Sequence, residues 1–178
     1  MAGYRHAGIV LLCLLFAADV SAQILRTEAL AAAFPGATIR QEQLFLTTDE
    51  QTRARDRSGV DTVPALVARY IATRDGRIVG AAYVDTHTVR SKRESLLVSL
   101  DGSGRVTRVD VTAFLEPAEY APSGAWLAQY RDRVLGDDLA IDRAIRPMAG
   151  ATLTARAVNT AVRRVLAIDQ VLGAGDAR

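Results

Sequence analysis

The sequence contains very little cysteine and histidine. Its only cysteine is Cys13, and its two histidines are His6 and His87. A chain that begins after residue 22 therefore cannot use disulfides, thiol catalysis or cysteine-ligated metals. It also keeps too few histidines for a multi-histidine metal site or a haem pair. No resident metal is expected, and we expect His87 to be an exposed residue near a strand end.

Long hydrophobic runs are also missing, and so is a large excess of charge. The net charge is +2 from 22 basic and 20 acidic residues, which is far from the basic excess of a nucleic-acid-binding protein. The longest apolar run, residues 8–18, is too short to span a bilayer comfortably. It follows Arg5 and precedes Val20-Ser21-Ala22, the arrangement of a cleavable signal peptide. Residues 1–22 therefore predict export to the periplasm, and an uncleaved, membrane-associated anchor is the alternative.

Residues 23–178 have a length that suits one domain with its own core. Apolar residues at helical spacing predict a first helix over residues 23–33. Alternating patterns and turn residues then predict an antiparallel meander with one face against helices, and thus an α+β fold. The alternation breaks near Asp110, where we expect a bulge. The predicted strands cover residues 38–46, 66–73, 77–86, 94–100 and 105–115.

The C-terminal third of the sequence is predicted to be helical. Ser123 is placed to begin a helix that contains Trp126 and Tyr130 on one face and continues to Val134. These two aromatic side chains are expected to pack in the core. A last helix, with an apolar stripe, runs from the threonines near residue 152 to about residue 172. The adjacent Arg163 and Arg164 are expected to face solvent.

The most informative stretch lies where this last helix begins. Pro147 disfavours a helix that runs through from upstream, so residues 148–154 (MAGATLT) predict a turn followed by a helix start. The first N–H groups of such a helix lack intrahelical partners, and its dipole is positive at this end. With Gly150 keeping the backbone accessible and hydroxyls at Thr152 and Thr154, the stretch suits a phosphate. An ordinary helix N-terminus is the alternative.

The string Gly150-Ala151-Thr152-Leu153-Thr154 resembles the signature of the FMN-binding domain family. This family includes the periplasmic flavin subunits of the sodium-translocating NADH:quinone oxidoreductase and of the Rnf complex. The resemblance is strongest over residues 146–158, and it implies FMN as cofactor, held by Gly150, Ala151, Thr152 and Thr154. In many members a flavin transferase links FMN to the threonine of G-A-T, here Thr152, through a phosphoester bond. The chain departs from the pattern at Arg146, where an acid is expected, and at Ala149, where Ser or Thr is expected.

The resemblance also suggests a role for Glu116. In the family a loop that contains glutamate and proline follows the last strand and lies near the flavin ring, and Glu116-Pro117 resembles its start. A plain connecting loop is the alternative. These residues complete the predicted cofactor site.

We expect an exported FMN-binding electron carrier or redox subunit rather than a substrate-specific enzyme. No pair of residues suggests acid–base catalysis, so no catalytic residue is assigned. There is no G-x-G-x-x-G for a nicotinamide, so electrons would come from redox partner proteins, either free or membrane-bound. Two alternatives stay open. One is a non-redox binding or assembly module that keeps the fold without flavin, and the other is a small flavin-dependent reductase.

Overall fold

The computed structural model describes residues 22–176, so the predicted signal segment lies outside the described residues. The first element is a helix at residues 22–33, which ends at the predicted Phe34-Pro35-Gly36 turn. The further elements, in chain order, are β1 (Thr38–Phe45), α2 (Thr48–Ser58), β2 (Leu66–Arg74), β3 (Arg77–Thr88), β4 (Arg93–Asp101), β5 (Val106–Phe114), the 3-10 turn η1 (Ala118–Tyr120), α3 (Gly124–Leu127), the 3-10 turn η2 (Ala128–Tyr130) and α4 (Thr152–Asp176).

The five strands form one antiparallel sheet in the order β1-β2-β3-β4-β5. Each strand pairs with the next along the chain, which confirms the predicted meander and the α+β class. The turn between β2 and β3 shows how local sequence achieves this. Asp75 and Gly76 have φ values of 52° and 73°, the left-handed conformation that a two-residue type I′ hairpin turn requires of both residues.

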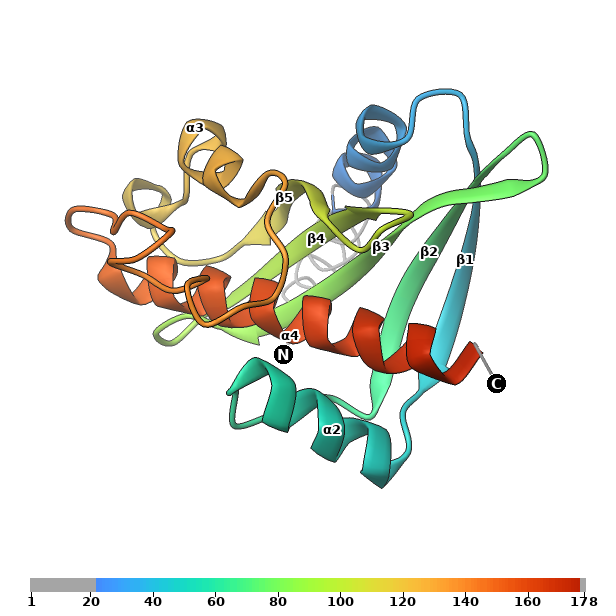
Figure 1. Ribbon diagram of the computed structural model, residues 1–178. Helices are drawn as coiled ribbons and strands as arrows, with labels where there is room; N and C mark the ends of the chain where they lie inside the picture. Colours follow the sequence, from blue (N-terminus) through green and yellow to red (C-terminus); the bar gives the residue numbers. More distant parts are fainter. Residues whose placement is uncertain (1–21, 177–178) are drawn as a thin grey trace, which may run out of the picture.

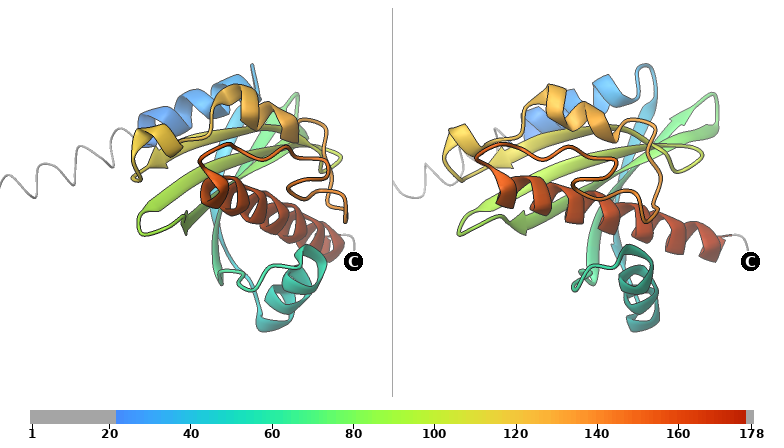
Figure 2. Two further views of the ribbon diagram at one scale, coloured as in Figure 1. Left: turned by 90° about the vertical axis from the view of Figure 1, so that its left-hand side faces the viewer. Right: turned by 60° about the vertical axis from the view of Figure 1, so that its left-hand side comes forward.

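Helices cover both faces of the sheet, whereas the sequence predicted cover on one face only. The long helix α4 lies across one face, and the helix at residues 22–33 lies on the other (Figures 1 and 2). β4 is consequently buried along almost its whole length. Leu96 belongs to the core cluster beneath α4, and its neighbour Leu97 packs against Leu30 of the first helix. An amphipathic first helix has to bury its apolar stripe, and the second sheet face provides the surface.

The predicted irregularity in β5 is present as two register shifts, one on either side of Asp110. Thr107 and Thr112 are the residues left without a cross-strand partner in the pairing of β4 with β5. Extra residues of this kind increase strand twist. The twist lets β5 bend toward the chain segment that leads to α3.

The helix predicted from Ser123 to Val134 is much shorter than expected. Ser123 caps α3 as predicted, because its hydroxyl accepts from the Trp126 N–H at 3.2 Å. The α-helix ends after Leu127, one 3-10 turn follows, and Val134 is 43% exposed outside any helix. The apolar spacing reflects packing of an irregular segment rather than a continuous helix. Within residues 22–176, no helix has both the length and the apolar character needed to cross a bilayer.

Gly80 on β3 is closely packed against the backbone of β4 and the ring of Phe34, the residue that follows the first helix. A Cβ added there would overlap the Leu100 carbonyl oxygen and come within 2.7 Å of Phe34 Cε1. We expect Gly80→Ala to lower the free energy of unfolding by about 1–3 kcal/mol through overpacking. Urea denaturation followed by circular dichroism measures this. Gly124→Ala is the control, because an added Cβ there meets open space, and equal midpoints for the two variants would contradict the packing.

Candidate functional site

The start of α4 has an exposed backbone with no side-chain cap at its first position. Gly150 has φ of 76°, and a Cβ added there would meet nothing within 4 Å. Ala151 precedes the first helical residue, and its methyl side chain cannot accept a hydrogen bond from the helix N–H groups. By contrast, Thr47 caps α2 and Ser123 caps α3 with hydroxyl groups. The first N–H groups of the 25-residue α4 are therefore available to an external acceptor.

A cavity of about 260 Å³ adjoins this helix start. All five residues predicted to bind the cofactor line it, although Glu116 lies more than 30 positions from the others. Thr152 is exposed, whereas Thr154 is only 1% exposed. The complete lining is Val89, Arg90, Glu116, Tyr120, Gly150, Ala151, Thr152, Leu153 and Thr154.

Glu116 shapes this cavity through the loop between β3 and β4. Its Oε1 accepts the backbone N–H groups of Ser91 and Lys92 at 2.7 Å each and of Arg90 at 3.2 Å. These bonds, that from Ser91 above all, lower the pKa of the Glu116 carboxyl. The carboxylate therefore holds Arg90 at the cavity wall. From the sequence, residues 89–93, which include this arginine, are expected only to form a basic segment that connects two strands.

A second and larger cleft of about 840 Å³ lies between β2, β3 and α4. Apolar residues such as Val67, Val165 and Ile168 form much of it, and Asp85, His87, Arg156, Thr160 and Arg164 add polar groups. Val89 and Leu153 line both the cleft and the smaller cavity. The two hollows are therefore neighbours along the start of α4.

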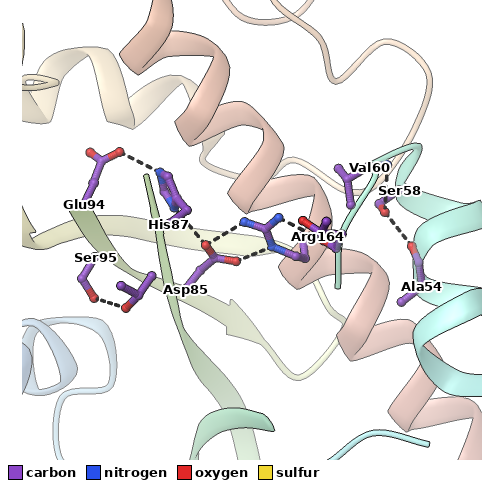
Figure 3. A network of polar contacts seen from close by, with 10 residues as sticks. Ala54, Ser58, Val60, Asp85, His87, Glu94, Ser95 and Arg164 are labelled. Carbon is purple, nitrogen blue, oxygen red and sulfur yellow. Dashed lines mark hydrogen bonds and ion pairs between the residues drawn. The ribbon is translucent and has the colours of Figure 1, made fainter. Parts of the chain in front are cut away.

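Four charged side chains form a continuous chain at the wall of this cleft (Figure 3). Arg164 of α4 donates to both oxygens of Asp85 at 2.7 and 2.9 Å. His87 lies 2.9 Å from Asp85 through Nδ1 and 3.0 Å from Glu94 through Nε2. Glu94 is fully buried, and the side chains of Asp85 and His87 are 6% and 11% exposed. We call these four residues the charged relay.

Hydrogen bonds within the charged relay favour the ionised forms of His87 and Asp85. Burial alone would lower the pKa of His87, but hydrogen bonds to Asp85 and Glu94 outweigh it and raise this pKa to about 9. Burial would raise the pKa of Asp85, but bonds from His87 and Arg164 lower it below its usual value. At pH 7 an imidazolium is thus held between two carboxylates.

The FMN-binding domain model of protein families matches residues 67–167, which is more than half of the chain. The chain belongs to the FMN-binding domain family. The match covers the sheet from β2 onward and α4 as far as Ala167, and it therefore includes the whole lining of the smaller cavity and most of that of the larger cleft. A comparison with curated proteins found no match. Family membership makes FMN the cofactor, while the individual contacts predicted for Glu116 and residues 150–154 stay predictions.

The structure corrects the expected positions of His87 and Arg164. Neither side chain faces solvent. Both belong to the charged relay, a cluster of titratable groups that the sequence analysis did not predict. β3 and β4 form a hairpin closed by the four residues 89–92, and its register places His87 opposite Glu94. Pairing the two strands symmetrically around this loop in the sequence would have predicted the contact. Nothing local in the sequence assigns Arg164 to Asp85. Arg163 is also engaged, since it donates to the Ser58, Gly136 and Leu139 carbonyls.

Trp126 and Tyr130 pack in or against the hydrophobic core, as the sequence analysis predicted. Trp126 and Tyr130 make an edge-to-face contact with ring centroids 5.7 Å apart, and neither lines the two hollows. Trp126 Nε1 donates to the Arg146 carbonyl at 2.8 Å. Arg146, the residue at the family's acidic position, in turn lies 3.3 Å from Gln129 Oε1. The pair thus supports the segment that leads into α4.

Titration of His87 makes stability depend on pH. The folded-state pKa of about 9 exceeds the unfolded value of 6.5, so this stabilisation is complete below pH 6.5 and is lost as pH rises through 9. The shift corresponds to up to roughly 3 kcal/mol. We expect the urea midpoint of the wild-type protein to fall between pH 6.5 and 9.5.

His87→Gln is the control for this pH dependence, because it keeps polar atoms but cannot titrate. Its midpoint should be lower at pH 6 and should change much less with pH over the same interval. Parallel pH profiles for both proteins would show that His87 has an ordinary pKa.

Proposed function

We propose that this protein is an exported FMN-binding electron carrier, with the phosphate end of FMN at the start of α4. The observation that carries the proposal is the junction of two hollows at one helix N-terminus. The smaller cavity adjoins N–H groups that no side chain caps, and the larger cleft continues from it past Val89 and Leu153. Export rests on the sequence of residues 1–22.

The residues at the smaller cavity suit a phosphate. The positive φ of Gly150 leaves its backbone open, and the N–H groups of Thr152 and Leu153 lie at the positive end of the α4 dipole, whereas the Ala151 N–H is bonded to the Met148 carbonyl. Arg90 lines the same cavity and adds a positive charge, which the nearby Glu116 carboxylate partly offsets. The neutral side chain of Ala151 leaves room that a longer capping residue would fill.

The volumes of the two hollows support a ligand that occupies both. Pockets for drug-sized ligands have volumes of about 300–1,000 Å³, so the 260 Å³ cavity can hold only part of FMN. The adjoining 840 Å³ cleft has room for the ring system between apolar side chains of β2 and α4. The chain would bind and orient the cofactor and exclude water from it. FMN supplies the redox chemistry when bound.

The geometry of the charged relay favours a carrier over a substrate-specific reductase. Both ring nitrogens of His87 are already bonded to carboxylates, and both oxygens of Asp85 are bonded to Arg164. These groups are therefore not free to exchange protons directly with a small substrate. A redox partner protein is the expected source and recipient of electrons. A non-redox module that has lost flavin remains the second candidate, motivated by the departures at Arg146 and Ala149.

Gly150→Val tests the phosphate end of the site. We expect FMN content per folded protein to fall at least tenfold, because a branched side chain obstructs the backbone and disfavours φ of 76°. Flavin absorbance and circular dichroism measure content and folding. The matched control is Gly76→Val, which carries the same conformational penalty at φ of 73° in the β2–β3 turn, with equally open surroundings. Equal FMN content in both variants would remove Gly150 from the site.

The exposure of the two threonines predicts which one can be modified. Thr152 is accessible at the cavity, whereas the side chain of Thr154 is buried. We expect protein from its native host to carry FMN as a phosphoester on Thr152. Thr152→Ala should then remove an adduct that survives denaturation, while Thr154→Ala keeps it. Intact-mass spectrometry distinguishes these results.

If Arg146 and Ala149 prevent recognition by the flavin transferase, FMN would bind without a covalent link. Denaturation of the wild-type protein would then release free FMN, and Thr152→Ala would weaken binding by only about 0.5–3 kcal/mol, as for a lost hydrogen bond. Protein that carries no flavin in either form, and that does not bind added FMN, would contradict the proposed function.

A further inference from the structure

The charged relay has no part in holding the phosphate end, yet it forms the wall of the cleft beside the proposed ring site. His87 precedes Val89 by two residues, about 7 Å along an extended strand, and Val89 lines both hollows. Asp85, His87 and Arg164 all line the cleft itself. Their charges therefore act on whatever occupies it.

The relay is electrically balanced when His87 is protonated. Asp85 and His87 come from β3, Glu94 comes from β4 and Arg164 comes from α4, which gives two positive and two negative charges. Arg156 of α4 also lines the cleft. Tyr130 approaches from η2, where burial and the Glu94 charge raise the pKa of its hydroxyl, so it stays neutral.

Removal of the His87 proton would disturb this balance. It would leave Asp85 and Glu94 ionised beside a neutral ring, with Arg164 as the remaining cation in contact with Asp85. Glu94 would lose the most stabilisation, because it is fully buried and its Oε1 has no hydrogen-bond partner among residues 22–176. Negative charge added to the cleft would make this loss still more costly. Proton occupancy of His87 and negative charge in the cleft therefore favour each other.

We propose that His87 is the residue that takes up a proton together with the electrons delivered to the bound FMN. This inference rests on the proposed function. At a pH between the pKa of His87 in the oxidised protein and its higher pKa in the reduced protein, two electrons from a donor protein enter with up to one extra proton, which binds the neutral imidazole ring and forms the imidazolium. At neutral pH the ring already carries this proton, so no additional proton is taken up there. His87 acts as a positioning residue for charge, without contact to a substrate.

Potentiometric titration of the flavin-loaded protein between pH 7 and 11 tests the proposal. Dithionite with redox mediators is the reductant, and flavin absorbance reports the midpoint potential. One extra proton per two electrons steepens the fall of the potential by about 29.6 mV per pH unit, the equivalent of a tenfold change for a two-electron couple. We expect a steepening of up to this size in the wild type, confined to the interval between the oxidised-state and reduced-state pKa values of His87, and its absence in His87→Gln. Identical pH profiles in the two proteins would overturn the proposal.

A second measurement needs no variant and keeps the proposal testable if His87→Gln folds poorly. NMR titration of the His87 ring in the wild-type holoprotein should give a pKa at least half a unit higher in the reduced than in the oxidised state. A purely structural role would leave the pKa unchanged on reduction, and that result would overturn the proposal. Failure of the wild type to retain FMN would instead contradict the proposed function. Retention of FMN with a fixed pKa would refute the role of His87 alone.

Discussion

The ion pair between Arg164 of α4 and Asp85 of β3 fixes how the long helix lies on the sheet. Both side chains are more than nine-tenths buried, and the guanidinium also donates to the Thr62 carbonyl. A buried charge without its partner costs several kcal/mol, so α4 cannot slide or rotate without breaking this contact. The same constraint sets where the first turn of the helix lies relative to the sheet. Thr152 and its neighbours consequently lie beside the loop that Glu116 holds.

This arrangement separates two tasks along one helix. The first turn of α4 and the open Gly150 before it offer backbone N–H groups to an anion, whereas residues 156–168 of the helix supply apolar side chains and Arg164 to the larger cleft. A cofactor with a phosphate at one end and a planar ring at the other matches this order. The family's cofactor, FMN, has this chemistry, and the proposed function therefore assigns its phosphate to the smaller cavity and its ring to the larger cleft.

The sequence predicted the elements that depend on local pattern. Alternation and the Asp75-Gly76 turn were sufficient for the meander, and the turn at Gly150 was sufficient for the start of α4. The charged relay depends on contacts between distant segments. Glu94 lies near the start of a strand that is buried along most of its length, and its partner is defined only by the hairpin register. The helical periodicity of α4 predicted that Arg164 faces solvent, because this periodicity contains no information about the buried Asp85 carboxylate on β3.

The proposed function requires that one FMN molecule occupies both hollows. Titration of the isotope-labelled, flavin-free protein with FMN, followed by NMR, tests this claim directly. We expect the amide signals of residues 150–154 and 89–92 and the ring signals of His87 to shift together, with one saturation curve. Shifts confined to a different part of the surface, such as the crevice beside Tyr70 under the first helix, would contradict the account.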